Sequence, residues 1–272
     1  MLQVKDFNAL ISCCNQNGGL YHLKRQKGMN TLQIILDIEC RGIARYGKGF
    51  VVASNEEGII LLDESLNVVN FSHAGKGLDL HGIAISGDFA YLAETKLNCI
   101  GIYDLSNGLN RVDEICFSSN RATDICHIND IFIEENSLFV SMFHLPGQFN
   151  IGGGVVEYSL KKKKVKNVLY EGISQPHSVM LYKNDLYFCN SEEFSVRKEN
   201  NILFKCLGYT RGLAVQNETV LIGQSITRHI NKLLGKHPNI SSDCGVYLLN
   251  MNNKLSTFVP IPSLEIYGII FI

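Results

Sequence analysis

The sequence lacks long apolar runs, and none of its hydrophobic segments approaches the ~18 residues that a membrane-spanning helix needs. Its first ten residues carry Lys5 and Asp6 and have no apolar core, so we expect no signal peptide. It also lacks a basic excess, because 25 Lys and Arg stand against 26 Asp and Glu, giving a formal net charge of −1. Nucleic-acid-binding domains usually carry a clear positive excess. We therefore expect no membrane and no nucleic acid among its partners.

Paired cysteine motifs are also lacking, since no Cys-x-x-Cys occurs, and this argues against a zinc knuckle. The odd count of nine cysteines, without an export signal, predicts reduced thiols and a cytoplasmic protein. Most of them stand inside apolar runs, where small buried hydrophobic residues are expected. The nine are Cys13, Cys14, Cys40, Cys99, Cys116, Cys126, Cys189, Cys206 and Cys244.

Helical periodicity is scarce and is confined to Ile226–Lys236, whereas one short pattern recurs along the whole chain. The pattern is a polar residue, a small residue and a brief apolar run, as in Leu80-His81-Gly82-Ile83-Ala84. Its successive intervals of 40, 48, 48, 34 and 56 residues lie around the roughly 40–50 residues that are typical of four-stranded propeller blades. The small residue, or its equivalent, stands at Gly42, Gly82, Asp130, Ser178, Gly212 and Gly268.

The two ends of the chain complement each other. The last segment, Tyr267–Ile272, is a first strand without partners, and the first forty residues supply three strands without a first one. Pairing them closes a sixth blade and removes exposed strand edges, whereas a β-sandwich would not need matching orphan strands. We therefore predict an all-β, six-bladed β-propeller that forms a single domain over residues 1–272. The three N-terminal strands are predicted at Ala9–Cys14, Gly19–Lys24 and Leu32–Ile38.

Polar residues cluster where a site is expected. Antiparallel pairing places the start of each first strand and the end of each second strand on one face. The strand-start residues are Arg41, His81, Asn129, Asp130, His177, Arg211 and Tyr267, and the residues after second strands are Ser54, Asn55, Glu94, His144, Asn190, Ser191, Gln224 and Ser225. The longest loops on this face, residues 143–153 and 224–244, are expected to cover the channel.

Arginine and histidine at one channel mouth favour a small anionic ligand, because the guanidinium fork suits carboxylate and phosphate. Arg41 and Arg211 would clamp the anion, and His81 and His177 would move protons. Asp130 and Glu94 are further catalytic candidates. A divalent cation held by Glu94, Asp130 and Asn190 with a histidine is an alternative, although no local ligand spacing supports it. These groups could instead line a water-filled channel and bond neighbouring loops.

Several segments resemble an uncharacterised bacterial family known as domain of unknown function 4915. They are Leu80–Ala84, Cys126–Asp130, Gln175–Ser178, Gly208–Leu213 and Ile222–Arg228. The resemblance covers roughly residues 41–228 and implies a propeller without an established reaction. Gly82 stands where the family usually has an acid, and Asp130 where it usually has glycine. The substrate-binding candidates are Arg41, Arg211, Asn129, Asn190, Ser225, Arg228 and Tyr267.

The layout is also similar to gluconolactonase-type propellers, which hold a divalent cation; Glu94, Asn129 and Asn190 would be the equivalent positions. Sialidases are excluded because their repeated Ser-x-Asp-x-Gly-x-x-Trp turns and tryptophan itself are absent. The resulting hypothesis is a hydrolase, lyase or isomerase acting on a small anionic or sugar-derived metabolite. The alternative is a non-catalytic propeller that binds a metabolite or a protein. No cofactor is assigned, and the oligomeric state stays open.

Overall fold

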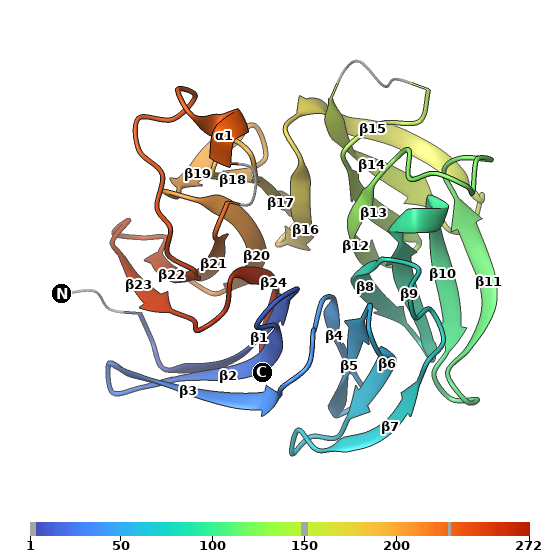
Figure 1. Cartoon of the computed structure of the whole chain (residues 1–272), viewed down its shortest axis with the longest axis horizontal. Helices are drawn as coiled ribbons and strands as arrows, with labels where there is room; N and C mark the ends of the chain where they lie inside the picture. Colours follow the sequence, from blue (N-terminus) through green and yellow to red (C-terminus); the bar gives the residue numbers. More distant parts are fainter. Residues whose placement is uncertain (1–3, 148–151, 228–229) are drawn as a thin grey trace. The chain divides into compact units, whose positions relative to one another are not determined.

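The computed structural model describes residues 4–147, 152–227 and 230–272. The chain is an all-β, six-bladed β-propeller made of four-stranded sheets, as predicted (Figure 1). The sheets have the strand orders β4-β5-β6-β7, β8-β9-β10-β11, β12-β13-β14-β15, β16-β17-β18-β19, β20-β21-β22-β23 and β24-β1-β2-β3. Two compact units can be distinguished, residues 41–186 and residues 1–40 with 187–272.

The unit of residues 41–186 contains blades one to three and the first strand of blade four. Its strands are β4 (Ile43–Tyr46), β5 (Gly49–Ser54), β6 (Gly58–Leu62), β7 (Val68–Ser72), β8 (Leu80–Ser86), β9 (Phe89–Glu94), β10 (Cys99–Asp104), β11 (Asn110–Cys116), β12 (Ile128–Glu134), β13 (Ser137–Met142), β14 (Gly153–Ser159), β15 (Lys164–Ile173) and β16 (Pro176–Tyr182). A short 3₁₀ turn, η1 (Thr95–Leu97), joins β9 to β10.

The unit of residues 1–40 and 187–272 contains the remaining strands. They are β1 (Phe7–Cys14), β2 (Gly19–Gln26), β3 (Met29–Leu36), β17 (Asp185–Asn190), β18 (Ser195–Lys198), β19 (Asn201–Lys205), β20 (Tyr209–Gln216), β21 (Thr219–Ser225), β22 (Gly245–Asn250), β23 (Ser256–Pro260) and β24 (Glu265–Phe271). The C-terminal β24 pairs antiparallel with β1, which confirms the predicted closure of the sixth blade (Figure 1). The predicted helix shrinks to α1 (Ile230–Leu233) among the described residues.

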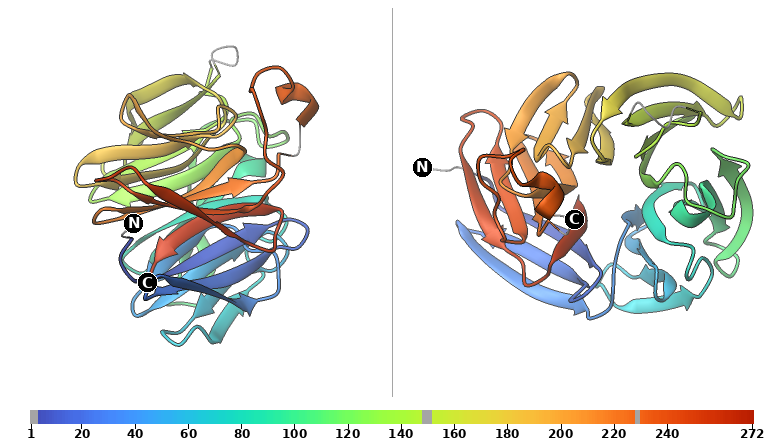
Figure 2. Two further views of the ribbon diagram at one scale, coloured as in Figure 1. Left: turned by 90° about the vertical axis from the view of Figure 1, so that its left-hand side faces the viewer. Right: turned by 45° about the horizontal axis from the view of Figure 1, so that its top comes forward.

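The middle strands of each blade are buried on both faces, because sheets pack face to face. β5 is buried along its whole length, while β7 at the outer edge of the same sheet is largely exposed. In the sequence, middle strands are therefore continuous apolar runs, without the alternation of apolar and polar residues that half-buried strands show. One core joins blades one and two through Val51, Leu80 and Tyr103. The individual sheets are visibly twisted (Figure 2).

The recurring polar–small pattern marks a β-bulge near the start of the first strand. On β8, Leu80 and Ile83 pair with Glu94 and Leu92, so His81 and Gly82 together face one residue of β9. Such a bulge bends the strand and re-aims the polar side chain. Equivalent register shifts occur at Asn129-Asp130 on β12, Arg211-Gly212 on β20 and Tyr267 on β24.

The residue that faces each bulge is small. A Cβ on Gly223 would collide with the backbone carbonyl oxygen of Arg211, so that position tolerates no side chain. In two blades a serine hydroxyl serves the displaced backbone: Ser141 accepts from the Asp130 N–H at 3.1 Å, and Ser12 accepts from the Gly268 N–H at 2.9 Å. The facing residues are Ala53, Ala93, Ser141, Gly223 and Ser12.

The cysteines depart from one expectation. Cys99 and Cys116, which are register partners on β10 and β11, form a disulfide, so the prediction of nine reduced thiols is wrong for this pair. The other seven are buried thiols, and burial raises the pKa of Cys126 to about 11 and of Cys244 to about 12. Across residues 4–147, 152–227 and 230–272, no helix has the length and hydropathy that crossing a bilayer requires. The cytoplasmic location stays a prediction.

Candidate functional site

Four aromatic rings form a row within the unit of residues 41–186. The rings of His81 and His127 meet edge to face with centroids 5.5 Å apart. His127 stacks on Phe143 at 4.4 Å and 27°, and Phe143 meets His177 edge to face at 5.3 Å. We call these four residues the imidazole row. Its three histidines come from the starts of blades two, three and four, so the topology brings together residues far apart in sequence.

All three imidazoles are bonded at Nδ1 by an oxygen that lies two or three residues earlier. His81 Nδ1 lies 2.8 Å from the Asp79 carbonyl oxygen, and His177 Nδ1 lies 3.0 Å from that of Gln175. His127 Nδ1 bonds the carboxylate of Asp124. A carbonyl oxygen can only accept, so Nδ1 of His81 and His177 carries the proton. Nε2 is then the nitrogen that neutral His81 and His177 present as an acceptor.

A local backbone device sets this geometry. Asp79 and Gln175 have positive φ values of 57° and 56°, and each directs its carbonyl oxygen at the imidazole two residues on. His127, with φ 47°, does the same for Asn129, whose Nδ2 donates to the His127 carbonyl oxygen at 3.1 Å. Left-handed backbone is unfavourable for these side chains. Its recurrence in three consecutive blades indicates a shared positioning role.

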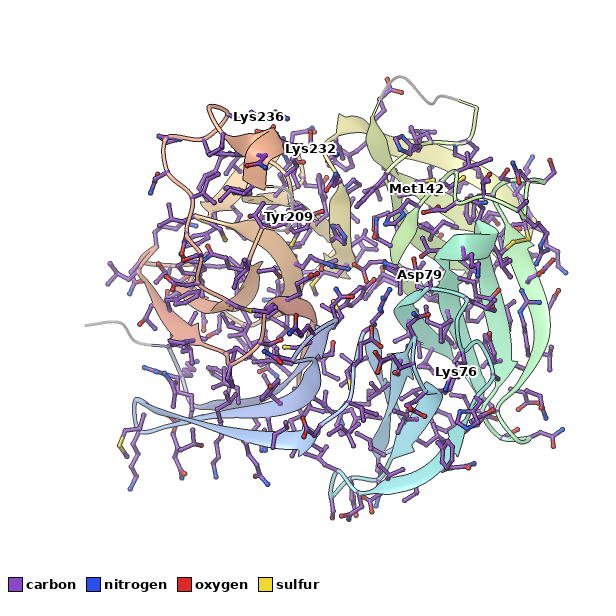
Figure 3. The ribbon with its side chains drawn as sticks, viewed as in Figure 1. Lys76, Asp79, Met142, Tyr209, Lys232 and Lys236 are labelled. Atoms are coloured by element: carbon purple, nitrogen blue, oxygen red, sulfur yellow. A yellow bond between two sulfur atoms is a disulfide. The ribbon has the colours of Figure 1, made fainter. Side chains whose placement is uncertain are left out.

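Arg41 lies beside the imidazole row. Its Nη1 donates to Asp79 Oδ1 at 2.6 Å and lies against the His81 ring, 3.2 Å from Nδ1 and 3.4 Å from Nε2 (Asp79 is labelled in Figure 3). Thr95 shares Nδ1 of His81 with the Asp79 carbonyl oxygen: its Oγ1 lies 2.8 Å from that nitrogen and accepts from it, because Oγ1 donates its own proton to the Ile128 carbonyl oxygen at 2.6 Å. Arg41 and His81 are buried, whereas the Asp79 side chain is 35% exposed. This corner holds a cation next to a fixed imidazole.

Asp130 links the first strands of blades two to four. Its Oδ2 accepts from the Ser178 N–H at 2.7 Å, where Ser178 has a φ of 54°. A Cβ on Gly82 would lie 2.6 Å from Asp130 Oδ1, so the carboxylate fills the space above that glycine. The two departures noted from the family pattern, Gly82 and Asp130, are therefore in contact. An acid on one strand occupies space that an acid on the other would need.

Glu94 lies in a charged network with Arg111 and Tyr103 of its own sheet. Its carboxylate is wholly buried and accepts from Arg111 Nε at 2.8 Å, from Arg111 Nη2 at 2.7 Å and from Tyr103 Oη at 2.6 Å. Arg111 and Arg121 also bond Glu114, and their hydrogen bonds lower the pKa of Glu114 to about 2. Because these hydrogen bonds occupy its oxygens, we propose a structural rather than a catalytic role for Glu94.

Arg211 belongs to a second cluster, within the unit of residues 1–40 and 187–272. Its Nη1 lies 3.3 Å from Glu265 Oε2 and 3.9 Å from Cys14 Sγ, and its guanidinium lies 4.4 Å from the centroid of the Tyr267 ring. All four residues are buried, and Arg211 Nε has no partner among the described residues. We call this set the Arg211 cluster. It joins β1, β20 and β24 at their bulged ends.

The remaining candidates are buried or lie outside the described residues. Ser225 bonds the backbone of β24, where its Oγ accepts from the Ile266 N–H at 3.1 Å. Asn190 ends β17 and is buried. Arg228 lies outside the described residues, as do residues 148–151 of one predicted covering loop, so that cover stays a prediction.

The predicted cation ligands do not coincide with the one cluster of possible metal ligands among the described residues. That cluster consists of Cys99, Glu114 and Cys116, whose three ligand atoms lie within 4.8 Å of one another. Its two sulfurs are joined in the disulfide. Glu94 is committed to Arg111, and Asp130 to Ser178. The divalent cation therefore stays a prediction.

Sequence reasoning missed three contributors to the site. His127 and Asp124 stand in a loop before β12, and Phe143 follows β13. Cys126 is buried, whereas His127 is half-exposed. The signal that was available is Asp-x-x-His, in which the Asp124 carboxylate accepts from both the His127 N–H and the ring.

Comparisons with known proteins agree with this architecture. The family model described as "Domain of unknown function (DUF4915)" matches residues 51–271. The chain belongs to this family. No sequence among the curated proteins matches it. Membership in the DUF4915 family does not identify a reaction, so the function has to be inferred from the site.

Solved structures share the fold of this DUF4915 protein at low sequence identity. A structure titled the nidogen/laminin complex matches with a TM-score of 0.67 and 11% identity, covering 97% of each chain. TolB from Acinetobacter baumannii matches with a TM-score of 0.66 and 12% identity, covering 97% of this chain and 66% of that chain. The computationally designed Ika8 protein matches with a TM-score of 0.50 and 9% identity. These likenesses concern the fold alone.

Proposed function

We propose that this DUF4915 protein binds a small anionic metabolite at the imidazole row and catalyses a proton-transfer reaction on it. The observation that carries the proposal is the repeated Nδ1 bonding of His81, His127 and His177. Three imidazoles oriented in this way supply acceptor nitrogens at one place, which is what general acid–base chemistry needs. Hydrolysis, elimination and isomerisation of a carboxylate- or phosphate-bearing metabolite are the reactions that fit.

Each residue has a role in this proposal. Arg41 binds the anion, because Asp79 and His81 hold its guanidinium in place. His127 accepts the proton at Nε2, since a carboxylate at Nδ1 orients the ring and stabilises the imidazolium that forms. His177 lies on the far side of Phe143 and returns a proton to the product. Asn129 and Asp130 are positioning residues.

Binding is tested first, with inorganic phosphate and D-gluconate as probes in isothermal titration calorimetry. We expect at least one probe to bind at millimolar concentration, and Arg41→Gln to weaken it by about tenfold or more. Arg45→Gln is the matched control, because Arg45 on β4 is exposed and its guanidinium lies over the ring of Phe50. Failure of both probes, or equal loss in both variants, would contradict an anion site at Arg41.

Turnover separates an enzyme from a scaffold. With a substrate found among sugar acids and their lactones, His127→Gln is expected to lower kcat by about 10²–10⁴-fold while affinity changes little. His73→Gln, on the exposed edge of blade one, is expected to leave kcat unchanged. Zinc, manganese and calcium analysis of the purified protein tests the cation alternative. A stoichiometric ion lost in a His81→Ala variant would replace acid–base chemistry with metal-assisted chemistry.

The second candidate is a non-catalytic scaffold that binds a metabolite or a protein. The similar structure titled as a complex of nidogen and laminin favours it, since there a propeller-like chain is crystallised with a partner. Binding of an anion without turnover, unaffected by His127→Gln, would support this candidate against the first.

A further inference from the structure

One cysteine, Cys116, is exposed, in contrast to the buried thiols. Cys99 is wholly buried, Cys116 is exposed at the end of β11, and a disulfide joins them. The other cysteines are buried, with desolvation raising the pKa of Cys126 to about 11. An incoming thiol can therefore reach Cys116, whereas the buried thiols are shielded.

A cation lies beside the exposed sulfur. Arg121 Nη1 is 3.5 Å from Cys116 Sγ, and the same guanidinium binds Glu114 through both carboxylate oxygens. A guanidinium stabilises a thiolate at Cys116, which makes this sulfur a better leaving group in the second step, when a mixed disulfide between Cys116 and a small thiol is resolved. Glu114 is the third donor near the sulfurs, but Arg111 and Arg121 occupy it. The arrangement favours thiol chemistry over cation binding.

The disulfide also lies at the start of residues 117–127, the segment that contains Asp124 and His127. Asn98, next to Cys99, clamps this segment with four bonds of 2.7–2.8 Å: its Nδ2 donates to the Asn120 and Thr123 carbonyls, and its Oδ1 accepts from two backbone N–H groups. Phe117, next to Cys116, donates its N–H to the Asn98 carbonyl oxygen at 2.9 Å. The disulfide thus holds together Asn98 and Phe117, the two residues that anchor this segment.

We infer that Cys99 and Cys116 form a thiol–disulfide exchange site whose oxidation state controls the order of residues 117–127. A small-molecule thiolate attacks Cys116 Sγ, the S–S bond breaks, and Cys99 Sγ leaves with the electron pair and takes a proton from water. A second thiolate then attacks the sulfur of the small molecule and releases Cys116. The protein disulfide gains two electrons, and two small thiols are oxidised to a disulfide.

The exchange is tested on the whole folded protein with dithiothreitol as the probe, followed by alkylation and mass spectrometry. We expect Cys99 and Cys116 to be labelled at a rate proportional to dithiothreitol, while Cys126 is labelled only on unfolding. Arg121→Gln should slow reduction by about threefold or more, and Arg45→Gln should not change it. Reduction that occurs only as fast as global unfolding would overturn the assignment.

Hydrogen–deuterium exchange tests the coupling separately from any activity. On reduction, amides in residues 117–127 should exchange about tenfold faster, whereas those of β13 should not change. A Cys99→Ser/Cys116→Ser variant should show the fast rate without reductant. Equal exchange in the oxidised and reduced proteins would refute the coupling, and slow exchange in the double variant would do so as well.

Discussion

Replacing Arg111 with methionine is expected to lower the free energy of unfolding by about 3–5 kcal/mol. The change removes the cation from Glu94 and both of its hydrogen bonds to the wholly buried carboxylate, while the hydrogen bond from the Tyr103 hydroxyl remains. Methionine preserves most of the packing of the arginine stem. The measurement is urea unfolding followed by circular dichroism.

The control for this prediction is Lys5→Met, which breaks an ion pair whose side chains are 77% and 43% exposed. That loss should stay within about 0.5 kcal/mol, because exposed pairs contribute little. A double variant, Glu94→Gln with Arg111→Met, should recover part of the loss, since no buried charge remains. A loss below about 1 kcal/mol in Arg111→Met would show that Glu94 is not held as a structural anion.

Arg211→Met is the second large effect, with an expected loss of about 3–5 kcal/mol. The substitution leaves the buried Glu265 carboxylate without its cation at 3.3 Å and removes the guanidinium from the Tyr267 ring. Arg41→Met is the matched comparison. It should cost less, about 1–2 kcal/mol, because its partner Asp79 is 35% exposed and water can solvate that carboxylate.

This comparison separates the two arginines that the sequence had placed in one role. Arg211 would be a structural cation of its cluster, and Arg41 would be the residue with capacity for a ligand. Equal losses in the two variants, measured by the same urea unfolding, would contradict that distinction. A large loss in Arg41→Met alone would reverse it.

The fold could be predicted from the sequence because the propeller repeats one physical device. A bulge at the start of each first strand needs a small residue within it and another opposite it, so Gly42, Gly82 and Gly212 recur at blade spacing. Continuous apolar runs followed because middle strands are buried on both faces. Pairing of β24 with β1 could be predicted from unmatched strands at the two ends.

The site was only partly predictable, because contacts within one sheet and between blades are not visible in a linear pattern. Glu94 follows a second strand like other candidates, yet Arg111, on the outermost strand of the same sheet, turns its side chain inward. His127 was not among the predicted site residues because it stands in a loop before β12, and its place in the row depends on stacking with Phe143. The pairing of Cys99 with Cys116 depends on the register of β10 and β11, which spacing alone does not fix.

The most direct test of the imidazole row is the protonation site of each histidine, read by ¹⁵N NMR of the side chains in mildly alkaline, ligand-free buffer. We predict that His81, His127 and His177 carry their proton on Nδ1, because each bonds an oxygen there. His237 is the internal contrast, since its Nε2 lies 2.9 Å from the Glu192 carbonyl oxygen and should carry the proton instead. Protons on Nε2 of His81 or His177 would contradict the account, because their acceptor nitrogens would then face the backbone.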